Sequence, residues 1–471
     1  MRFTPIKFIK NRLAMLWPPI YDSLGENADG CARGRRGMLF GNFFAGASVN
    51  LISGLYFTGL LLAMNASDAY IGYISVGVTA CGFIQIVSPM VLERMQRRKV
   101  LLMTLRGIFY FINIFVLGTI PLLPIDNGLR LGIFMVAVML MNLVSSFGSP
   151  GMSIWHMQNV PDSKRATFFS LSSMGGTIIG SAITFSAGLL MDGFESSSTS
   201  LWGINPTLSA IVVLRAIALV FAIGEFVCFA KIKEHPYVSK RDTPKVGPKM
   251  YLLPLKNRPF MAMLCIQLAW SFTTAIIGQY YTVYLISDVG VSYAFLSSMS
   301  VISIPLSLIF TPVWASVINR RGWLPTLSFA MLVYSLAYFG NVFVTASTVP
   351  LYIGIVILCN VFSPGISLSF SNLPYMRMPN ENRTVYLSVY TTCTSLAGML
   401  GGFIGTQIIT STAGLSLNIF GLEAVNKQYI NLLQFALVVT LAVLIGIYGR
   451  KERAEKKLSR TISEASQEVS Q

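Results

Sequence analysis

Residues 149–153 read Ser-Pro-Gly-Met-Ser, and residues 363–367 read Ser-Pro-Gly-Ile-Ser. Each copy lies inside an apolar stretch long enough for a membrane-spanning helix, which needs about 20 residues. Three further matches pair residues 54–58 with 278–282, 89–98 with 312–321, and 161–170 with 379–388. All four matches occur in the same order, at separations between 214 and 224 residues, which indicates a duplicated unit.

Twelve apolar windows can each cross the hydrocarbon core, and every match joins one span to the span six later. We place the spans at 37–64, 69–93, 100–123, 130–156, 166–191, 206–231, 259–285, 291–318, 323–345, 350–376, 384–411 and 428–449. Because six is even, both copies enter the membrane from the same side. The sequence therefore predicts an all-α polytopic membrane protein of 12 transmembrane helices, built as two six-helix repeats related by a pseudo-two-fold axis along the membrane normal.

The composition agrees with a lipid environment. Hydrophobic residues make up 54% of the chain, charged residues 11%, and the mean hydropathy is +0.63. A soluble domain is typically about 25% charged, so the composition excludes a soluble enzyme, a disordered protein and a nucleic-acid binder as descriptions of the whole chain. The lipid bilayer is the expected partner.

The net charge of +16 is distributed unevenly across the predicted membrane. Of the 35 Lys and Arg residues, 31 fall in the tails and loops of the side that carries both termini. By the positive-inside rule this side is cytoplasmic. We expect a multi-pass protein of the cell membrane, in a bacterium the inner membrane, with both termini in the cytoplasm.

The same pattern predicts the domain organisation. Residues 1–36 are a basic cytoplasmic tail with a candidate interfacial helix, and residues 450–471 are a cytoplasmic tail expected to be disordered. Between them, residues 37–231 form the N-terminal six-helix half, 232–258 a cytoplasmic linker, and 259–449 the C-terminal six-helix half.

The loops after spans 2 and 8 carry a further signal. The first contains Glu93-Arg94, and the second contains Asn319-Arg320-Arg321-Gly322. Together with the twelve-span repeat, they resemble the major facilitator superfamily of secondary transporters, whose signature in these loops is Gly-x-x-x-Asp-Arg-x-Gly-Arg-Arg. The second copy has Asn in place of Asp, and the first keeps an acidic residue but lacks both glycines. The chain is thus similar to a divergent, bacterial-type member over residues 37–449.

This resemblance implies that spans 1, 4, 7 and 10 line a central cavity. The repeat offsets pair Asn50 with Thr274 and Ser146 with Asn360, which gives four polar side chains near the middle of these spans. A buried amide needs a wet cavity or a neighbouring helix as partner, so hydrogen bonding between helices remains the alternative. Further candidates for contact with a solute, or else for packing, are Tyr56, Asn142, Gln267, Trp270, Gln279, Tyr281 and Ser363.

A second set of residues is a candidate for gating or for structural roles. Proline frees a backbone carbonyl one turn earlier and glycine removes side-chain bulk, so the Pro-Gly pairs of spans 4 and 10 could bend there; static close packing is the alternative. The set consists of Glu93, Arg94, Pro150, Gly151, Arg165, Asn319, Arg320, Pro364, Gly365 and Arg383.

Few charges lie inside the predicted spans. Arg106 in span 3 and Glu225 in span 6 lie at similar depths, and we hypothesise that they form a structural ion pair. Arg215 lies ten residues from Glu225, about 15 Å along a helix, which is too far for a direct pair. Arg215 could instead attract an anionic solute.

These features predict secondary transport of a small neutral or weakly charged organic solute by alternating access. The alternatives are efflux of amphipathic drugs and a non-transporting membrane sensor or scaffold. The span 4 arginine of proton-coupled members of the family and the span 5 Gly-Pro of its drug/proton antiporters are both absent from this sequence. No Gly-x-x-x-x-Gly-Lys-Ser/Thr motif occurs. We expect no enzymatic activity, no cofactor, no metal and no nucleic-acid partner. We also expect a monomer, and a coupling ion stays open.

Overall fold

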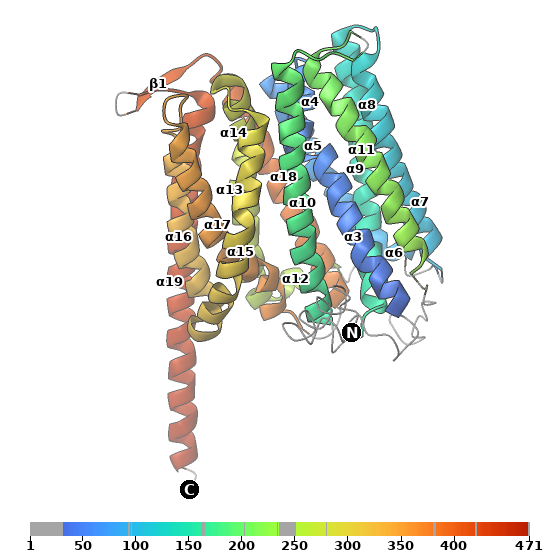
Figure 1. Cartoon of the computed structure of the whole chain (residues 1–471). Coiled ribbons are helices and arrows are strands. Elements are labelled where there is room, and N and C mark those ends of the chain that lie inside the picture. Colours follow the sequence, from blue (N-terminus) through green and yellow to red (C-terminus); the bar gives the residue numbers. More distant parts are fainter. Residues whose placement is uncertain are drawn as a thin grey trace, which may run out of the picture. The chain divides into compact units, whose positions relative to one another are not determined.

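The computed structural model describes residues 32–92, 95, 97–161, 165–201, 203–232, 234, 251–278, 280–379, 383–419 and 422–469 (Figure 1). Within these residues, 12 helical segments are long and apolar enough to cross a membrane. They coincide with the twelve predicted spans apart from small shifts at their ends. The first 31 residues, with the predicted interfacial helix, and residues 235–250 of the linker lie outside the described part.

The chain divides into two compact units. Unit 1 contains residues 1–67, 81–246 and 292–304. Its elements are α3 (Ala32–Ile52), α4 (Gly54–Ala63), η1 (Cys81–Ile86), α6 (Ser88–Leu92), α7 (Lys99–Tyr110), η2 (Phe111–Val116), α8 (Leu117–Thr119), η3 (Ile120–Leu122), α9 (Asn127–Gln158), α10 (Arg165–Ser196) and α11 (Pro206–Ala230). The η elements are short 3₁₀ or π helices that continue the α-helical spans.

Unit 2 contains residues 68–80, 247–291 and 305–471. Its elements are α5 (Asp68–Ala80), α12 (Leu253–Lys256), α13 (Arg258–Ile277), α14 (Tyr280–Val283), η6 (Tyr284–Asp288), α16 (Trp323–Asn341), α17 (Val349–Asn372), η7 (Leu373–Met376), α18 (Arg383–Ser411), β1 (Ser416–Ile419), β2 (Leu422–Val425) and α19 (Asn426–Val469). The strands form an antiparallel hairpin with Leu417 opposite Ala424. Helix α15 (Tyr293–Arg321) begins in unit 1 and continues in unit 2.

Two segments group differently from the halves that the sequence predicts, and each makes polar contacts with the unit in which it lies. Residues 293–304 of α15 lie in unit 1, where Asp192 of α10 accepts hydrogen bonds from the backbone N–H groups of Tyr293 (2.9 Å) and Ala294 (3.0 Å). Helix α5 lies in unit 2, where Lys427 pairs with Asp68 at its first residue at 3.0 Å. The domain boundaries at 231 and 259 stay predictions.

Spans 1 and 7 are each interrupted at an equivalent glycine of the repeat. Gly54 has φ +56° and Gly278 has φ +50°, a left-handed conformation that favours glycine. The tyrosine two residues later anchors the resumed helix in both units. Tyr56 donates to the carbonyl of Thr184 in α10, and Tyr280 donates to the hydroxyl of Thr406 in α18 at 3.0 Å.

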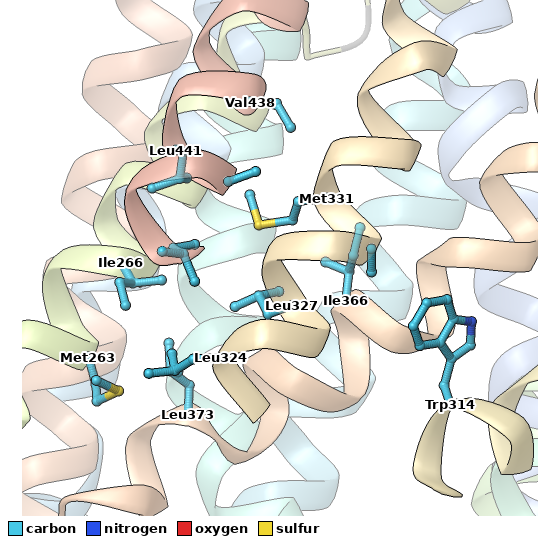
Figure 2. Packing of buried hydrophobic residues seen from close by; sticks show 13 residues of the cluster. Met263, Ile266, Trp314, Leu324, Leu327, Met331, Ile366, Leu373, Val438 and Leu441 are labelled. Atoms are coloured by element: carbon cyan, nitrogen blue, oxygen red, sulfur yellow. The ribbon is translucent and has the colours of Figure 1, made fainter. Parts of the chain in front are cut away.

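The core of unit 2 is an apolar cluster between α13, α15, α16, α17 and α19. Figure 2 shows Leu327 and Met331 of α16 lying among side chains of the neighbouring helices. In unit 1, large apolar side chains lie on the surface: Val136 of α9 and Val220 of α11 are each 68% exposed. Exposed apolar side chains of this kind are typical of helices whose outer surface contacts lipid.

The carboxyl end of the chain corrects one prediction. The composition of residues 450–471 predicts a disordered tail, but α19 continues as a helix to Val469. The segment is rich in Ala, Glu, Lys and Arg, which are strong helix formers, and it places Glu452 four residues before Lys456. A segment with too few apolar residues for a core can still continue a helix that the membrane span has already nucleated.

Candidate solute-binding pocket

Unit 2 contains a cavity of about 420 Å³ between α13, α16, α17 and α18. This volume lies within the range of about 300–1,000 Å³ that is usual for small-molecule sites. The cavity is lined by Gln267, Trp270, Tyr334, Ser363, Ile366, Ser367, Phe370, Ser371 and Tyr390. None of these residues carries a formal charge at neutral pH.

One wall of this pocket is a row of hydroxyl groups. Ser363, Ser367 and Ser371 follow one another at intervals of four residues, which places them on one face of α17. All three residues are exposed. Within the described part of the chain their hydroxyls have no hydrogen-bond partner, whereas the nearby Ser369 donates to the carbonyl of Gly365 at 2.8 Å.

Aromatic rings give the pocket an apolar wall in addition to the hydroxyl row. Trp270 of α13 and Phe370 of α17 are stacked, with ring centroids 5.2 Å apart and an angle of 20° between the planes. Stacking covers one face of each ring, and the rest of both rings is apolar surface. The pocket therefore combines a hydroxyl row with an aromatic wall.

A side-chain pair adds a fixed amide to the pocket. The hydroxyl of Tyr390 donates to Oε1 of Gln267 at 2.9 Å, and Nε2 of Gln267 lies 3.5 Å from the hydroxyl of Ser271. The bond from Tyr390 occupies the amide oxygen and orients the side chain. The long contact to Ser271 leaves the amide N–H₂ group free to donate to a solute.

The Pro364-Gly365 pair lies at the level of this pocket in α17, which continues through it as a helix. A Cβ atom at Gly365 would lie 2.7 Å from the indole of Trp314, so glycine permits the contact with α15. The indole N–H of Trp314 donates to the carbonyl of Val361 at 2.7 Å. That carbonyl lies three residues before the proline, next to the Asn360 carbonyl whose N–H partner the proline removes.

Unit 1 repeats this arrangement around Pro150-Gly151 in α9. The hydroxyl of Ser88 donates to the carbonyl of Phe147, again three residues before the proline, at 2.6 Å. A smaller cavity of about 240 Å³ lies beside it between α3, α7, α9 and α11. Its polar lining residues are Asn42, Arg106, Ser145, Ser149, Ser153, His156 and Glu225.

The smaller pocket differs from the larger one by its charges. Arg106 Nε lies 2.9 Å from Glu225 Oε1, and the Glu225 side chain is 1% exposed. The ion pair hypothesised from matched depth is therefore present. Tyr110, which is not among the residues predicted from the sequence, donates to the same carboxylate and accepts from Arg106 at 2.9 Å. This network satisfies the buried carboxylate, as a structural role requires.

Arg215 lies apart from both pockets. It is 3% exposed and donates to the backbone carbonyl of Asn113 and, at 3.1 Å, to the side-chain oxygen of the same residue. This position favours a structural role over attraction of a solute.

Only three of the predicted solute contacts line the larger pocket, namely Gln267, Trp270 and Ser363. Three others bond within their own helices, where Asn142, Thr274 and Asn360 donate to the carbonyls of Val138 (2.8 Å), Trp270 (2.9 Å) and Val356 (2.8 Å). Ser146 and Asn50 line neither pocket.

The predicted tyrosines serve the packing of the spans. Tyr56 bonds to the carbonyl of Thr184, and Tyr281 donates to the carbonyl of Asn341 at 3.4 Å. Gln279, Glu93 and Arg94 lie outside the described residues.

Among the gating candidates, Asn319 and Arg320 are exposed near the end of α15. Arg165 and Arg383 are the first residues of α10 and α18, and their side chains are not among the described ones.

Five polar or aromatic residues of the larger pocket are not among those predicted from the sequence: Tyr334, Ser367, Phe370, Ser371 and Tyr390. A spacing signal could have found two of them, because Ser363, Ser367 and Ser371 form a Ser-x-x-x-Ser-x-x-x-Ser pattern on a helix. The residues on α16 and α18 have no such pattern.

Comparison with solved structures gives fold-level matches. A mutant form of the nucleoside transporter NupG superposes with a TM-score of 0.62 at 13% identity, covering 88% of this chain and 98% of that one. The POT family transporter PepTSo gives a TM-score of 0.62 at 11% identity, covering 91% and 99%. A D-xylose-proton symporter gives 0.61 at 12% identity, covering 87% and 96%. All three are transporters.

No protein with a curated description matches the sequence. The model of the Major Facilitator Superfamily matches residues 38–402, which is most of the chain. Together with twelve membrane-spanning helices, this match shows that the chain is a multi-pass membrane protein and belongs to the Major Facilitator Superfamily.

Proposed function

We propose that this protein moves a small organic solute, neutral or weakly charged, across the membrane by alternating access, and that the larger pocket is part of its solute site. The observation that carries this proposal is the 420 Å³ pocket with hydroxyl groups left free for a ligand. Serine hydroxyls in apolar helices usually bond to a carbonyl one turn earlier. Three hydroxyls that do not, on one face of α17, support binding of a solute or water.

The absence of charge in the lining supports a neutral or weakly charged solute. Transfer of a full charge into an apolar environment without a partner is very costly. Gln267 and the serines offer dipoles in place of a counter-ion.

Efflux of amphipathic drugs, including cationic ones, is the second candidate. The faces of Trp270, Phe370 and Tyr334 at one pocket favour it, because aromatic rings attract cations. This candidate leaves the hydroxyl row without a role, so it ranks below a polar solute.

Counterflow in proteoliposomes tests the transport proposal. Vesicles containing the purified protein are preloaded with a high concentration of one unlabelled solute, and uptake of the same labelled solute is followed without nucleotide. Saturable counterflow of at least one solute class, lowered by Gln267→Leu, is expected. Saturable binding without counterflow of any solute would instead favour a sensor or scaffold.

The charge distribution further supports placing both termini in the cytoplasm. An epitope attached after Gln471 should bind antibody only after the cells are permeabilised. Binding to intact cells would overturn this orientation.

A further inference from the structure

We infer that the solute is an uncharged ring compound with several hydroxyl groups, the chemistry shared by monosaccharides and nucleosides. This inference rests on the proposed transport function and identifies the class of solute that the larger pocket accepts. The hydroxyl row, the amide of Gln267, the aromatic wall and the lack of charge in the pocket support this class.

The hydroxyl row fits a solute with several polar groups along one side. Residues four apart on an α-helix are separated by about 6 Å along the axis, so Ser363, Ser367 and Ser371 extend over about 12 Å. Each serine can both donate and accept a hydrogen bond. A solute hydroxyl has the same dual capacity, so a polyhydroxylated edge can bond to the row in either direction.

The Gln267–Tyr390 pair provides a second polar point on different helices. Because Tyr390 donates to Oε1, Gln267 presents its N–H₂ donors, and the Tyr390 oxygen keeps a lone pair that can accept. A ring oxygen or carbonyl suits the amide donors, and a hydroxyl suits the tyrosine oxygen. Polar contacts on two sides select a compact ring over an extended chain.

The aromatic wall is the reason for inferring that the solute contains a ring. Trp270 and Phe370 are stacked at 5.2 Å and line the pocket together with Ile366. A heterocyclic base can stack on such a surface, and the C–H face of a sugar ring packs on it by dispersion. Amino acids with small side chains have no flat face to bury there.

The contrast with unit 1 supports an uncharged solute. The smaller pocket has serines at the repeat positions of Ser363 and Ser367, namely Ser149 and Ser153, but also holds the Arg106–Glu225 pair. The hydroxyls of the larger pocket face no ionisable carboxylate, amine or guanidinium among its lining residues. An anion or a zwitterion would therefore enter it without a counter-charge.

The test compares solute classes on the full-length protein. Counterflow in proteoliposomes is measured for D-glucose, D-xylose, uridine, adenosine, L-leucine and tetraphenylphosphonium. Thermal stabilisation of the purified protein by the same six compounds provides an independent readout of binding. We expect saturable counterflow and stabilisation with at least one sugar or nucleoside, and neither effect with leucine or tetraphenylphosphonium.

The variants test the hydroxyl row against a matched control on the same helix. Ser367→Ala should raise the half-saturating solute concentration about three- to tenfold, since it removes one hydrogen bond to the solute. Ser369→Ala removes a hydroxyl that is buried and bonded within α17, and should leave the half-saturating concentration unchanged. Both variants should retain the unfolding midpoint of the parent within the error of the measurement, which separates loss of binding from loss of folding.

The outcomes are distinguishable. Counterflow of sugars alone, or of nucleosides alone, supports the inference and shows which of these two classes of compound the protein accepts. Counterflow of leucine or tetraphenylphosphonium without any sugar or nucleoside overturns the inference but leaves the transport function standing. Equal effects of Ser367→Ala and Ser369→Ala also overturn it. Stabilisation by a sugar or nucleoside without counterflow of any of the six compounds counts against the transport function, whereas neither effect with any sugar or nucleoside overturns the inference alone.

Discussion

Gly54 and Gly278 lie 224 residues apart and both adopt a left-handed backbone conformation at the point where a membrane span is interrupted. In each case a tyrosine two residues later is hydrogen-bonded to a threonine residue on another helix of the same unit. The repeat thus preserves a backbone conformation together with the contact that holds the resumed helix.

Replacing either glycine by alanine should destabilise the protein. A Cβ at positive φ costs about 1–2 kcal/mol. A Cβ would meet open space at Gly54, and at Gly278 it would meet only the Ala275 carbonyl oxygen at 3.5 Å and the Ser75 hydroxyl at 3.7 Å. Gly54→Ala and Gly278→Ala should each lower the thermal unfolding midpoint.

The control for these glycines is Gly132→Ala in α9, where a Cβ also meets open space but the backbone is helical. That change should be neutral or stabilising by up to about 1 kcal/mol. A fall in midpoint as large as at Gly54 would contradict the conformational explanation.

Removing one partner of the Arg106–Glu225 pair should cost more than removing both. Arg106→Gln leaves the carboxylate of Glu225 buried without its cation, a loss of about 3–5 kcal/mol in stability. The double variant Arg106→Gln with Glu225→Gln replaces the charges by amides and should recover part of this loss. Denaturation of the parent, of Arg106→Gln, of Glu225→Gln and of the double variant in one detergent measures the coupling. Strictly additive effects would show that the two residues are independent, despite the 2.9 Å contact.

Gly365→Ala should disturb the contact between α17 and α15. The new Cβ would lie 2.7 Å from the Trp314 indole, and overpacking of this kind costs about 1–3 kcal/mol. Gly354→Ala, on the same helix but facing open space, is the matched control and should not destabilise. Combining Gly365→Ala with Trp314→Leu should restore part of the unfolding midpoint relative to Gly365→Ala. No recovery would indicate that Trp314 is not the obstacle.

Lys427→Met should lower stability modestly and in a salt-dependent way. Lys427 Nζ lies 3.0 Å from Asp68 and 3.1 Å from Asp288, whose side chains are 35% and 38% exposed. Because water and salt screen such partly exposed pairs, about 1 kcal/mol is expected at low ionic strength. The difference from the parent should shrink as salt is raised, whereas Lys451→Met, an exposed lysine of the same helix, should show no such difference. A loss independent of salt would argue against an electrostatic origin.

Part of the candidate site could be predicted from the sequence because the two copies of the duplicated unit share a recognisable motif in the span that lines it. The Pro364-Gly365 pair and Ser363 follow from the match with residues 149–153, and Gln267 and Trp270 follow from their place in span 7. Asn360 and Thr274, which the repeat offsets predict as solute contacts, do not line the larger pocket, since a polar residue in a span can satisfy itself on its own helix, as both do here. Local hydrogen bonding of this kind cannot be separated from ligand binding by residue type alone.

The sequence by itself determined the membrane class, the twelve spans, the duplication and the depth match between Arg106 and Glu225. These properties depend on hydropathy, on the rise of a helix and on repeated spacing, all of which are local in the chain. Only the tertiary structure decided that Tyr334, Phe370 and Tyr390 share one pocket and that Tyr110 completes the ion pair. These residues come together because helices distant in sequence pack side by side, and which faces meet depends on the fit of all their side chains at once.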